Sequence, residues 1–281
     1  IISASLRGVG AALGRTRLTP FTGALTATVA LVLGTLTCIF VAFEGVIFRT
    51  YPFPDADRLV LVWEADRDSG AAHLPLTESA FPTYHRNVRS FEKLAGLIPI
   101  FPDLPITVVD TRERINLVNA TPDLFRMLGA RAQLGRLFST EEGLPGGESV
   151  VLLSEGFWKR HFGGRRDVIG QRLLLNQYGN RETFTVVGVL AKDVTFPYPL
   201  YKERPDVWAA YREVGGKFVP GHNLYAVGKL RRGIDLAHAE AEMSQINQAI
   251  AKEQPRWYGA VSVSLTPLRA ESLKDINDIV H

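Results

Sequence analysis

Two short stretches of this chain contain residues that could bind a nucleotide or act as a nucleophile. Gly228-Lys229 stands in AVGKL, where a phosphate-binding loop needs a serine or threonine after the lysine and further glycines before it. Ser154 stands in LLSEG, which lacks the first glycine of a nucleophile elbow and is better suited to cap a helix. Neither stretch predicts nucleotide binding or nucleophilic catalysis.

Histidine, acidic and tryptophan residues give no pattern of a catalytic or metal site either. The histidines before the last residue lack the spacing of metal ligands; they stand at positions 73, 85, 161, 222 and 238. Acidic pairs such as Glu141-Glu142 are typical of helix starts and solvated faces. We therefore expect a protein that is not an enzyme and has no catalytic residue, cofactor or metal ligand.

The composition is that of one domain of moderate size or two small ones. The chain has 281 residues, 46% of them apolar, and a net charge of +3. Three arginines lie among the first twenty residues, and the remainder carries 29 basic and 29 acidic residues. This balance excludes the basic face of a nucleic-acid-binding protein. The single cysteine, Cys38, excludes an internal disulfide.

An apolar run separates these arginines from the rest of the chain. The 23 residues from Phe21 to Phe43 carry no charge, and a helix needs only ~20 to cross a bilayer. A cleaved signal peptide is the alternative, but its apolar core is ~7–15 residues long and ends at a small-x-small site. We therefore expect a transmembrane helix at 21–48, which the prolines at 52 and 54 prevent from continuing.

The arginines also predict the topology. Arg7, Arg15 and Arg17 all precede the apolar run, and positive charge favours the cytoplasmic side. We expect residues 1–20 in the cytoplasm and residues 49–281 outside the cell (inner) membrane. Because the first residue is Ile rather than Met, we also expect a fragment of a longer protein.

Small side chains recur every four residues along the expected helix. They are Thr22, Thr26, Ala30, Gly34, Cys38 and Ala42. In lipid, small residues let helices approach closely and increase van der Waals contact. Two interpretations stay open: this ridge packs on other helices or a second copy, or it reflects the usual composition of apolar helices.

The segments at the two ends of the polar part predict a pair of β-α-β units. The first has a strand at 57–66, a helix at 81–96 with apolar residues at helical spacing, and a strand at 105–110. The second has a strand at 222–230, a helix capped by Asp235, and a strand at 260–268 with alternating apolar residues.

The middle of the chain predicts mixed helices and strands. We expect strands at 113–120, 149–153, 171–176, 182–190 and 206–211. Thr121 and Pro122 should start a short helix that Gly129 stops, and Ser154 should cap a second one. The fold class predicted is α+β: one N-terminal transmembrane helix, then two β-α-β units with an inserted α+β subdomain.

Several of these stretches together resemble the MacB-like, FtsX-type permeases of ABC transporters. The stretches are YPFPDADRLVLVWE, FPTYHRNVRSFEKLAG, TPDLFRMLGARAQLGRLFSTEE, VVLLSEGFWKRHFGGRRDVIGQRLLLN, FTVVGVL and LRRGIDLAHAEAEM. The resemblance implies an extracytoplasmic core domain, with porter-like halves at 57–112 and 217–270 and an inserted subdomain at 113–216. It also implies further transmembrane helices, which this chain does not contain.

The resemblance implies a transport function. A separate cytoplasmic ABC ATPase would move the membrane helices, and this domain would carry that motion to a periplasmic adaptor or to substrate. The other permease helices or a second permease copy would be partners in the lipid bilayer. A singly anchored binding or sensory module is the alternative from another class, and an anchored hydrolase is a third.

Overall fold

The computed structural model contains two compact units, Ile1–Thr50 and Tyr51–His281, each of which is described by itself. The structure describes residues 23–26, 28–35, 37, 53–99, 106–108, 114–177, 180–192, 205–213 and 221–270. The α+β fold class predicted for the second unit is confirmed, since a large mixed sheet is combined with helices.

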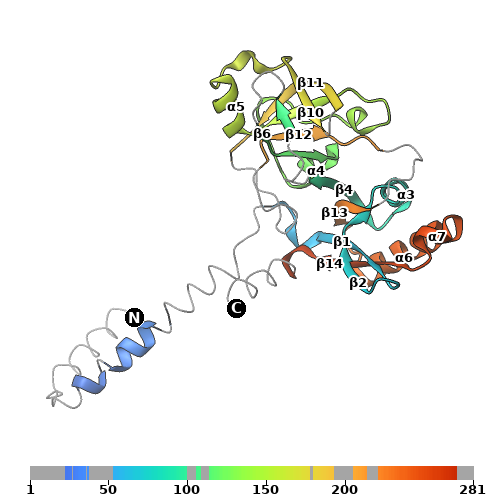
Figure 1. Cartoon of the computed structure of the whole chain (residues 1–281). Helices are drawn as coiled ribbons and strands as arrows, with labels where there is room; N and C mark the ends of the chain where they lie inside the picture. Colours follow the sequence, from blue (N-terminus) through green and yellow to red (C-terminus); the bar gives the residue numbers. More distant parts are fainter. Residues whose placement is uncertain are drawn as a thin grey trace. The chain divides into compact units, whose positions relative to one another are not determined.

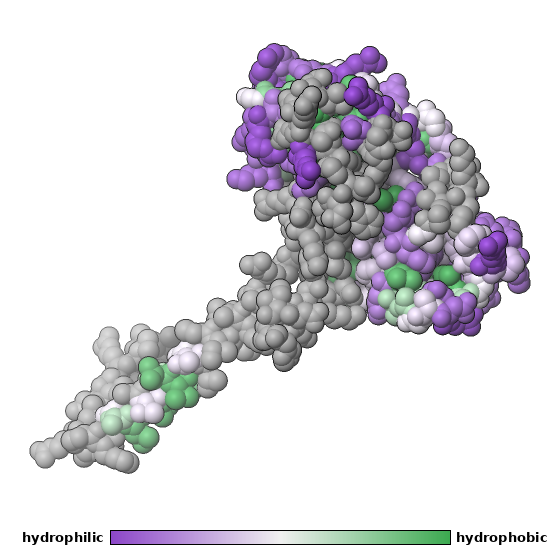
Figure 2. Space-filling view, in the orientation of Figure 1, coloured by the Kyte–Doolittle hydropathy of each residue, from purple (hydrophilic) through white to green (hydrophobic). Residues whose placement is uncertain are grey.

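The described part of the first unit is helical. Three threonine hydroxyls donate to carbonyls four residues earlier in this helix. They belong to Thr28, Thr35 and Thr37, at 2.9, 2.8 and 2.7 Å, and each is therefore hydrogen-bonded within the apolar helix. Leu31 and Leu33 are exposed, and the apolar residues show green in Figure 2. Within the described residues, no helix reaches the length and apolarity that a membrane crossing requires. The span expected at 21–48 lies partly outside these residues, is not confirmed, and stays a prediction.

The second unit is built on one 14-stranded sheet (Figure 1). Its main path runs β14-β1-β13-β4-β7-β12-β9-β11-β10-β5-β6, while β2, β3 and β8 pair with β1, β13 and β11. The strands are β1 Leu59–Asp66, β2 Ala71–Leu74, β3 Leu76–Thr77, β4 Phe91–Pro99, β5 Ile106–Val108, β6 Arg114–Ile115, β7 Leu117–Ala120, β8 Ala132–Gly135, β9 Val150–Leu153, β10 Arg172–Gln177, β11 Asn180–Leu190, β12 Val207–Ala210, β13 His222–Leu230 and β14 Val261–Pro267.

Helices cover this sheet. The α-helices are α3 Phe81–Asn87, α4 Pro122–Met127, α5 Glu155–Phe162, α6 Leu236–Glu253 and α7 Pro255–Tyr258. Short 3-10 helices are η1 Ala56–Arg58, η2 Glu141–Gly143 and η3 Arg166–Val168. In Figure 1, α6 and α7 lie beside β14 and β1, whereas α5 lies beside the strands of the middle segment.

The first and last segments of the unit interleave into a four-stranded β-α-β-β-α-β arrangement. Strands β1 and β14 are antiparallel neighbours, and β13 lies between β1 and β4. Each β-α-β unit is therefore split by a strand of the other, in the order typical of ferredoxin-like folds. Helix α3 connects β1 to β4, and α6 connects β13 to β14.

The predicted boundaries of the first β-α-β unit are wrong. The helix expected at 81–96 ends at Asn87, and the chain forms strand β4 from Phe91 to Pro99. The backbone amides of Arg89 and Ser90 donate to the carboxylate of Glu242 on α6, at 2.9 and 2.8 Å. These contacts hold the chain extended after the helix, so β4 rather than the strand at 105–110 completes the unit.

The middle segment continues the same sheet. β4 pairs with β7, which is parallel to β12, and β9 is parallel to β11. The hairpin predicted between the strands at 171–176 and 182–190 is confirmed, since Gln177 is the register partner of Asn180. The short helix predicted after Thr121 is α4, and Gly129 follows it with a positive φ of 71°.

Three apolar clusters fill the layers of the unit. One lies under α3 and α6 and contains Val60, Val62, Met243 and Val263. A second covers the opposite face of β1 and extends over α4. The third lies between α5 and the middle strands. The alternation of β1 side chains between the first two clusters means that β1 is buried on both faces.

Candidate functional site

The first and last described segments of the second unit lie at one end of the paired strands β1 and β14. We call residues 53–59 and 267–269 the junction end. The register joins Val60 to Pro267, so the start of the first strand lies beside the end of the last. Arg269 Nη1 and Asp57 Oδ1 form an ion pair at 2.7 Å between the two segments. The first and last described segments of the unit are therefore joined at a single place.

The first residues of the junction end are packed into the unit. Phe53 is 7% exposed and belongs to the core cluster under α4. Pro54 lies against Gly129, where an added Cβ would come within 2.8 Å of its Cδ and Cγ atoms. Gly129 also has a φ of 71°, which side chains disfavour. The incoming chain is thus fixed to the helix α4 of the middle segment.

Asp55 is the centre of an ion-pair network at the junction end. Its backbone is left-handed, with a φ of 53°, which is uncommon outside glycine. Its Oδ2 atom lies 2.8 Å from Lys229 Nζ and 2.7 Å from Arg58 Nη2. The hydrogen bond from Lys229, followed by that from Arg58, lowers the pKa of Asp55 to about 2. The aspartate is therefore held ionised and orients the turn before β1.

Arg58 connects this turn to β13, the neighbour of β1, and to β4, the next strand in the sheet. Its Nη1 atom donates to Glu92 Oε2 on β4 and to the carbonyl of Leu230 on β13, both at 2.9 Å. Hydrogen bonds from Arg58 to Asp55 and Glu92 raise the pKa of the guanidinium. One side chain thus joins the incoming turn, β4 and β13.

Gly228 and Lys229 make structural contacts near the end of strand β13. A Cβ at Gly228 would lie 2.0 Å from Phe91 Cε1, so glycine is needed for the close approach of that ring. The Lys229 ammonium lies beside Asp55, and its side chain is largely buried. This pair is part of β13 and not of a glycine-rich loop that could hold a phosphate.

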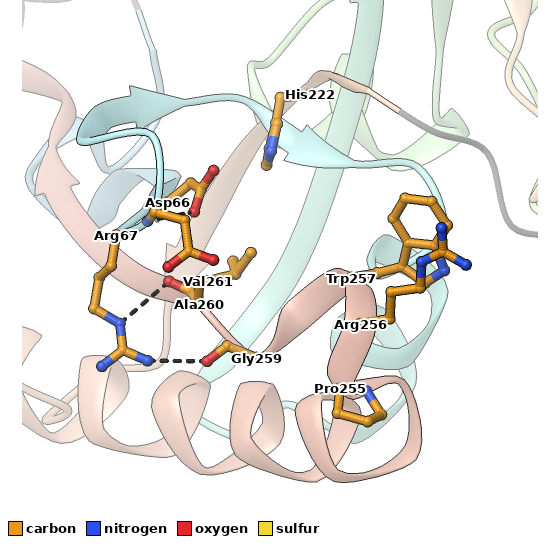
Figure 3. A pocket seen from close by; sticks show the side chains of 10 residues that line it. Asp66, Arg67, His222, Pro255, Arg256, Trp257, Gly259, Ala260 and Val261 are labelled. Carbon is orange, nitrogen blue, oxygen red and sulfur yellow. Dashed lines mark hydrogen bonds between the residues drawn. The ribbon is translucent and has the colours of Figure 1, made fainter.

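A polar cavity lies at the other end of β1 (Figure 3). It has a volume of about 430 Å³ and is lined mainly by the turn after β1 and by α7. Arg67 donates to the carbonyls of Gly259 and Ala260 at 2.9 and 3.3 Å, which closes one wall. Arg256 lies over the ring of Trp257 at 5.1 Å on another wall. We call this the cavity end of the unit.

A buried carboxylate and a histidine meet beside the cavity. Glu64 has no exposed side-chain surface, and its Oε2 atom lies 2.9 Å from Nδ1 of His222, which lines the cavity. The same oxygen accepts from the amide of Thr77 at 3.1 Å. His222 Nδ1 also lies 3.0 Å from the carbonyl of Pro75, so both neighbours are acceptors and Nδ1 carries a proton.

The pKa values of Glu64 and His222 are both raised in the folded unit. Desolvation raises the pKa of Glu64, while the hydrogen bond to Glu64 raises the pKa of His222. Thr77 is further joined to Tyr258 by a 2.8 Å hydrogen bond between their hydroxyls. The described part of the chain contains no group of three or more metal-ligating side chains that could hold an ion. The pair fixes β1, β13 and the β3 segment to one another.

Only some of the predicted site residues lie in the described part of the chain. Thr26, Ala30 and Gly34 are exposed on the helix of the first unit. Thr22, Cys38 and Ala42 lie outside the described residues, so the ridge stays a prediction. Ser154 caps α5 by accepting from the amide of Phe157 at 3.1 Å, as the sequence predicted.

The junction-end network was not predicted from the sequence. Asp55 and Arg58 have the three-residue spacing of a local ion pair directly after two prolines. This spacing was the only sequence feature that could have indicated the network. Lys229 lies 174 positions beyond Asp55, and no sequence pattern joins them. No sequence pattern joins Glu64 to His222 either.

Comparisons with known proteins identify the family. The family model described as MacB-like periplasmic core domain matches residues 22–246. This is well over half of the chain, and the protein belongs to this family. The resemblance to MacB-like permeases is therefore confirmed. No curated protein sequence gives a significant match.

Two solved structures are similar in fold. A domain of a putative permease protein from Porphyromonas gingivalis is 18% identical, with a TM-score of 0.55, covering 76% of this chain and 92% of that one. The periplasmic region of MacB from Actinobacillus actinomycetemcomitans is 12% identical, with a TM-score of 0.52, covering 83% of this chain and 97% of that one. At these identities the likeness concerns the fold alone.

Proposed function

We propose that the second unit is the extracytoplasmic domain of an ABC transporter permease and relays ATP-driven motion of membrane helices to export partners or substrate. The observation that carries this proposal is the junction end. The first and last strands of the unit are antiparallel neighbours, and Asp57 and Arg269 pair across them. A domain carried between two membrane helices needs its two connections side by side, and membership of the MacB-like family supports the same reading.

The proposal includes the membrane arrangement expected from the sequence. Residues 21–48 cross the inner membrane with the N-terminus in the cytoplasm, where a separate ABC ATPase drives the permease. The other permease helices or a second copy pack on the ridge that includes Ala30 and Gly34. A periplasmic adaptor receives the motion. Residues 57–112 and 217–270 act as porter-like halves with 113–216 inserted, and the domain itself performs no catalysis.

A rigid connection is the feature that separates a relay from a tethered binding module. Inserting a flexible segment of about six Gly and Ser residues directly before Phe53 in the intact permease should reduce export strongly. The fold of the domain and the assembly with the ATPase should persist, because Phe53 and Pro54 keep their contacts. A tethered module would tolerate the insertion.

The matched control places the same segment after Gly146. This residue is in an exposed loop with a φ of 84° and open space around it, so the insertion should leave export unchanged. Equal export from both insertion variants and the unmodified permease would contradict the relay. Stimulation of the ATPase by the permease should be recorded beside export, because this second measurement does not require the substrate to be known.

The membrane arrangement has a test of its own. Single cysteines at Ser5 and Ser69, in a Cys38→Ser background, should differ in their reaction with an impermeant maleimide in intact cells. Ser69→Cys should react and Ser5→Cys should be protected. The reverse result would contradict the topology. Replacing Ala30 and Gly34 by Leu should impair assembly, whereas Leu33→Ile should not.

A further inference from the structure

Among the described residues, strand β14 forms one edge of the large sheet, and Pro267 at its end is its only residue of a type that usually protects an edge. Its seven residues, VSVSLTP, carry no charge. All seven pair with β1 in continuous register from Val261 to Pro267, without a bulge. Native edge strands are commonly protected by lysines, bulges, internal prolines or shortness. The opposite end of the path, β6, has only two residues, one of them Arg114. The β14 edge is therefore suited to strand addition.

The register defines which backbone groups face outward from this edge. The amide of Arg67 donates to the carbonyl of Ala260 at 3.1 Å, and these two residues continue the β1–β14 register. Backbone groups alternate along a strand, so those of Ser262, Ser264 and Thr266 point to β1. Those of Val263 and Leu265 point away from it and have no hydrogen-bond partner among the described residues. The outward carbonyl of Val261 is taken by Asn247 at 2.7 Å.

The strand is chemically self-complementary about Ser264. In an antiparallel pair of two copies centred there, Val263 lies opposite Leu265 of the other copy, and Ser262 lies opposite Thr266. The apolar pair lies on the α6 face, where Val263 and Leu265 are buried in the cluster beneath α3 and α6. The hydroxyl pairs lie on the other face. Cross-strand pairs of like polarity stabilise a sheet, and no like charges meet.

We propose that β14 is an interface at which a second copy of this chain adds its own β14 antiparallel, so that the two sheets join. The outward groups of Val263 and Leu265 then form about four backbone hydrogen bonds with those of the partner copy. The twofold axis passes beside Ser264, perpendicular to the sheet, and the two α6 helices lie on the same side. This interface does not depend on the transport function, because it rests on the strand alone.

The register makes a disulfide test possible. Ser264 and its symmetry mate form a non-hydrogen-bonded pair, in which Cα atoms lie about 4.5 Å apart, within the range that a disulfide spans. In the full chain with Cys38→Ser, Ser264→Cys should give a covalent dimer on oxidation. Ser262→Cys is the matched control, because its symmetry mate lies about 14 Å away along the strand. A mixture of Ser262→Cys and Thr266→Cys chains should give the crosslinked heterodimer.

Charge at the same position provides a second, non-covalent test. Ser264→Lys places two ammonium groups opposite each other across the axis and should weaken dimerisation about fivefold in sedimentation equilibrium. Ser262→Lys places each lysine opposite a threonine and should have the smaller effect. Circular dichroism should show both variants folded, since both side chains point away from α6.

Three outcomes would overturn the proposal. These are equal crosslinking at positions 262 and 264, a monomeric Ser264→Cys chain whose introduced thiol is protected from maleimide, and unchanged dimerisation in Ser264→Lys. The second would show that another segment of the same chain covers the edge.

Discussion

The two ends of strand β1 hold charged groups in opposite ways. At the junction end, Arg58 pairs with Asp55 and with Glu92 of the nearby β4, and these carboxylates keep 41% and 47% of their side-chain surface exposed. At the cavity end, near the far end of the same strand, Glu64 has none exposed. Exposed pairs contribute little and can break and re-form, whereas a buried carboxylate that loses its partner is strongly destabilised. The ion pairs of the junction end can thus rearrange, whereas the Glu64 pair at the cavity end is a fixed attachment.

The difference has a physical origin in solvation. When two exposed charged groups form an ion pair, they give up part of their hydration for an attraction of similar strength. A buried carboxylate has already lost its water, so its hydrogen bonds to Thr77 and His222 are its main compensation. If this comparison is right, substitutions at the two ends will differ in how much they lower the stability of the fold. Their effects will also differ in pH dependence and in salt dependence.

The largest effect is expected at His222. His222→Ala leaves Glu64 buried without its ring partner, and the free energy of unfolding should fall by about 3 kcal/mol. Urea denaturation followed by tryptophan fluorescence measures this loss. The double variant with Glu64→Gln should recover part of it, because no buried charge then remains. A loss below about 1 kcal/mol for His222→Ala would remove the distinction between the two ends.

Packing beneath the junction end should give the next largest effect. In Gly228→Ala the new methyl group meets the ring of Phe91 at 2.0 Å, so the ring or the strand must shift. Overpacking of this kind costs about 2 kcal/mol, measured as a shift of the urea midpoint. Gly23→Ala is a useful control, since its Cβ would meet nothing within 4 Å. Equal stability of the two variants would mean that Phe91 moves freely.

The cavity end should make stability fall as the pH rises. The folded-state pKa of His222 is raised above its ordinary 6.5 and that of Glu64 above its ordinary 4.5. The folded state thus binds more protons, and the stabilisation is complete below the unfolded pKa values and is lost through the raised ones. Urea midpoints measured from about pH 6 upward should decline, and His222→Asn should flatten the decline. Parallel curves for the two proteins would assign the dependence to other groups.

The smallest effect is expected at Asp55 and has the opposite sign in pH. Its pKa is lowered from 3.8 to about 2, so its contribution is present above pH 3.8 and is lost as the pH falls toward 2. Asp55→Asn should shift the urea midpoint only slightly at neutral pH and reduce the loss between about pH 4 and 2. The shift should shrink further in about 1 M salt, which screens exposed pairs. A salt-independent loss larger than that of His222→Ala would reverse the comparison.

Local sequence signals predicted many of the elements well. The strand expected at 222–230 is β13 without change, and Asp235 caps α6 by accepting from the amide of His238 at 2.7 Å. The alternating strand near the C-terminus is β14. Capping, glycine stops and two-residue periodicity act within a few residues, so a single sequence contains the information that they need.

The helix expected at 81–96 shows where local signals fail. Tyr84, Val88, Phe91 and Ala95 have helical spacing, but the same run also fits a buried strand. The outcome depends on Glu242, more than 150 positions later, which binds the amides after Asn87. Pairing of Phe91 with Leu230 then adds strand hydrogen bonds that a helix could not offer at this place.

The sequence by itself determined the α+β class, the caps of α5 and α6, and the family to which the chain belongs. Only the tertiary structure decided that β13 lies between β1 and β4, that Asp57 pairs with Arg269, and that Glu64 meets His222. The physical reason is distance along the chain. Caps and periodicity are short-range, whereas strand order and burial of a charge depend on which distant segments exclude water together.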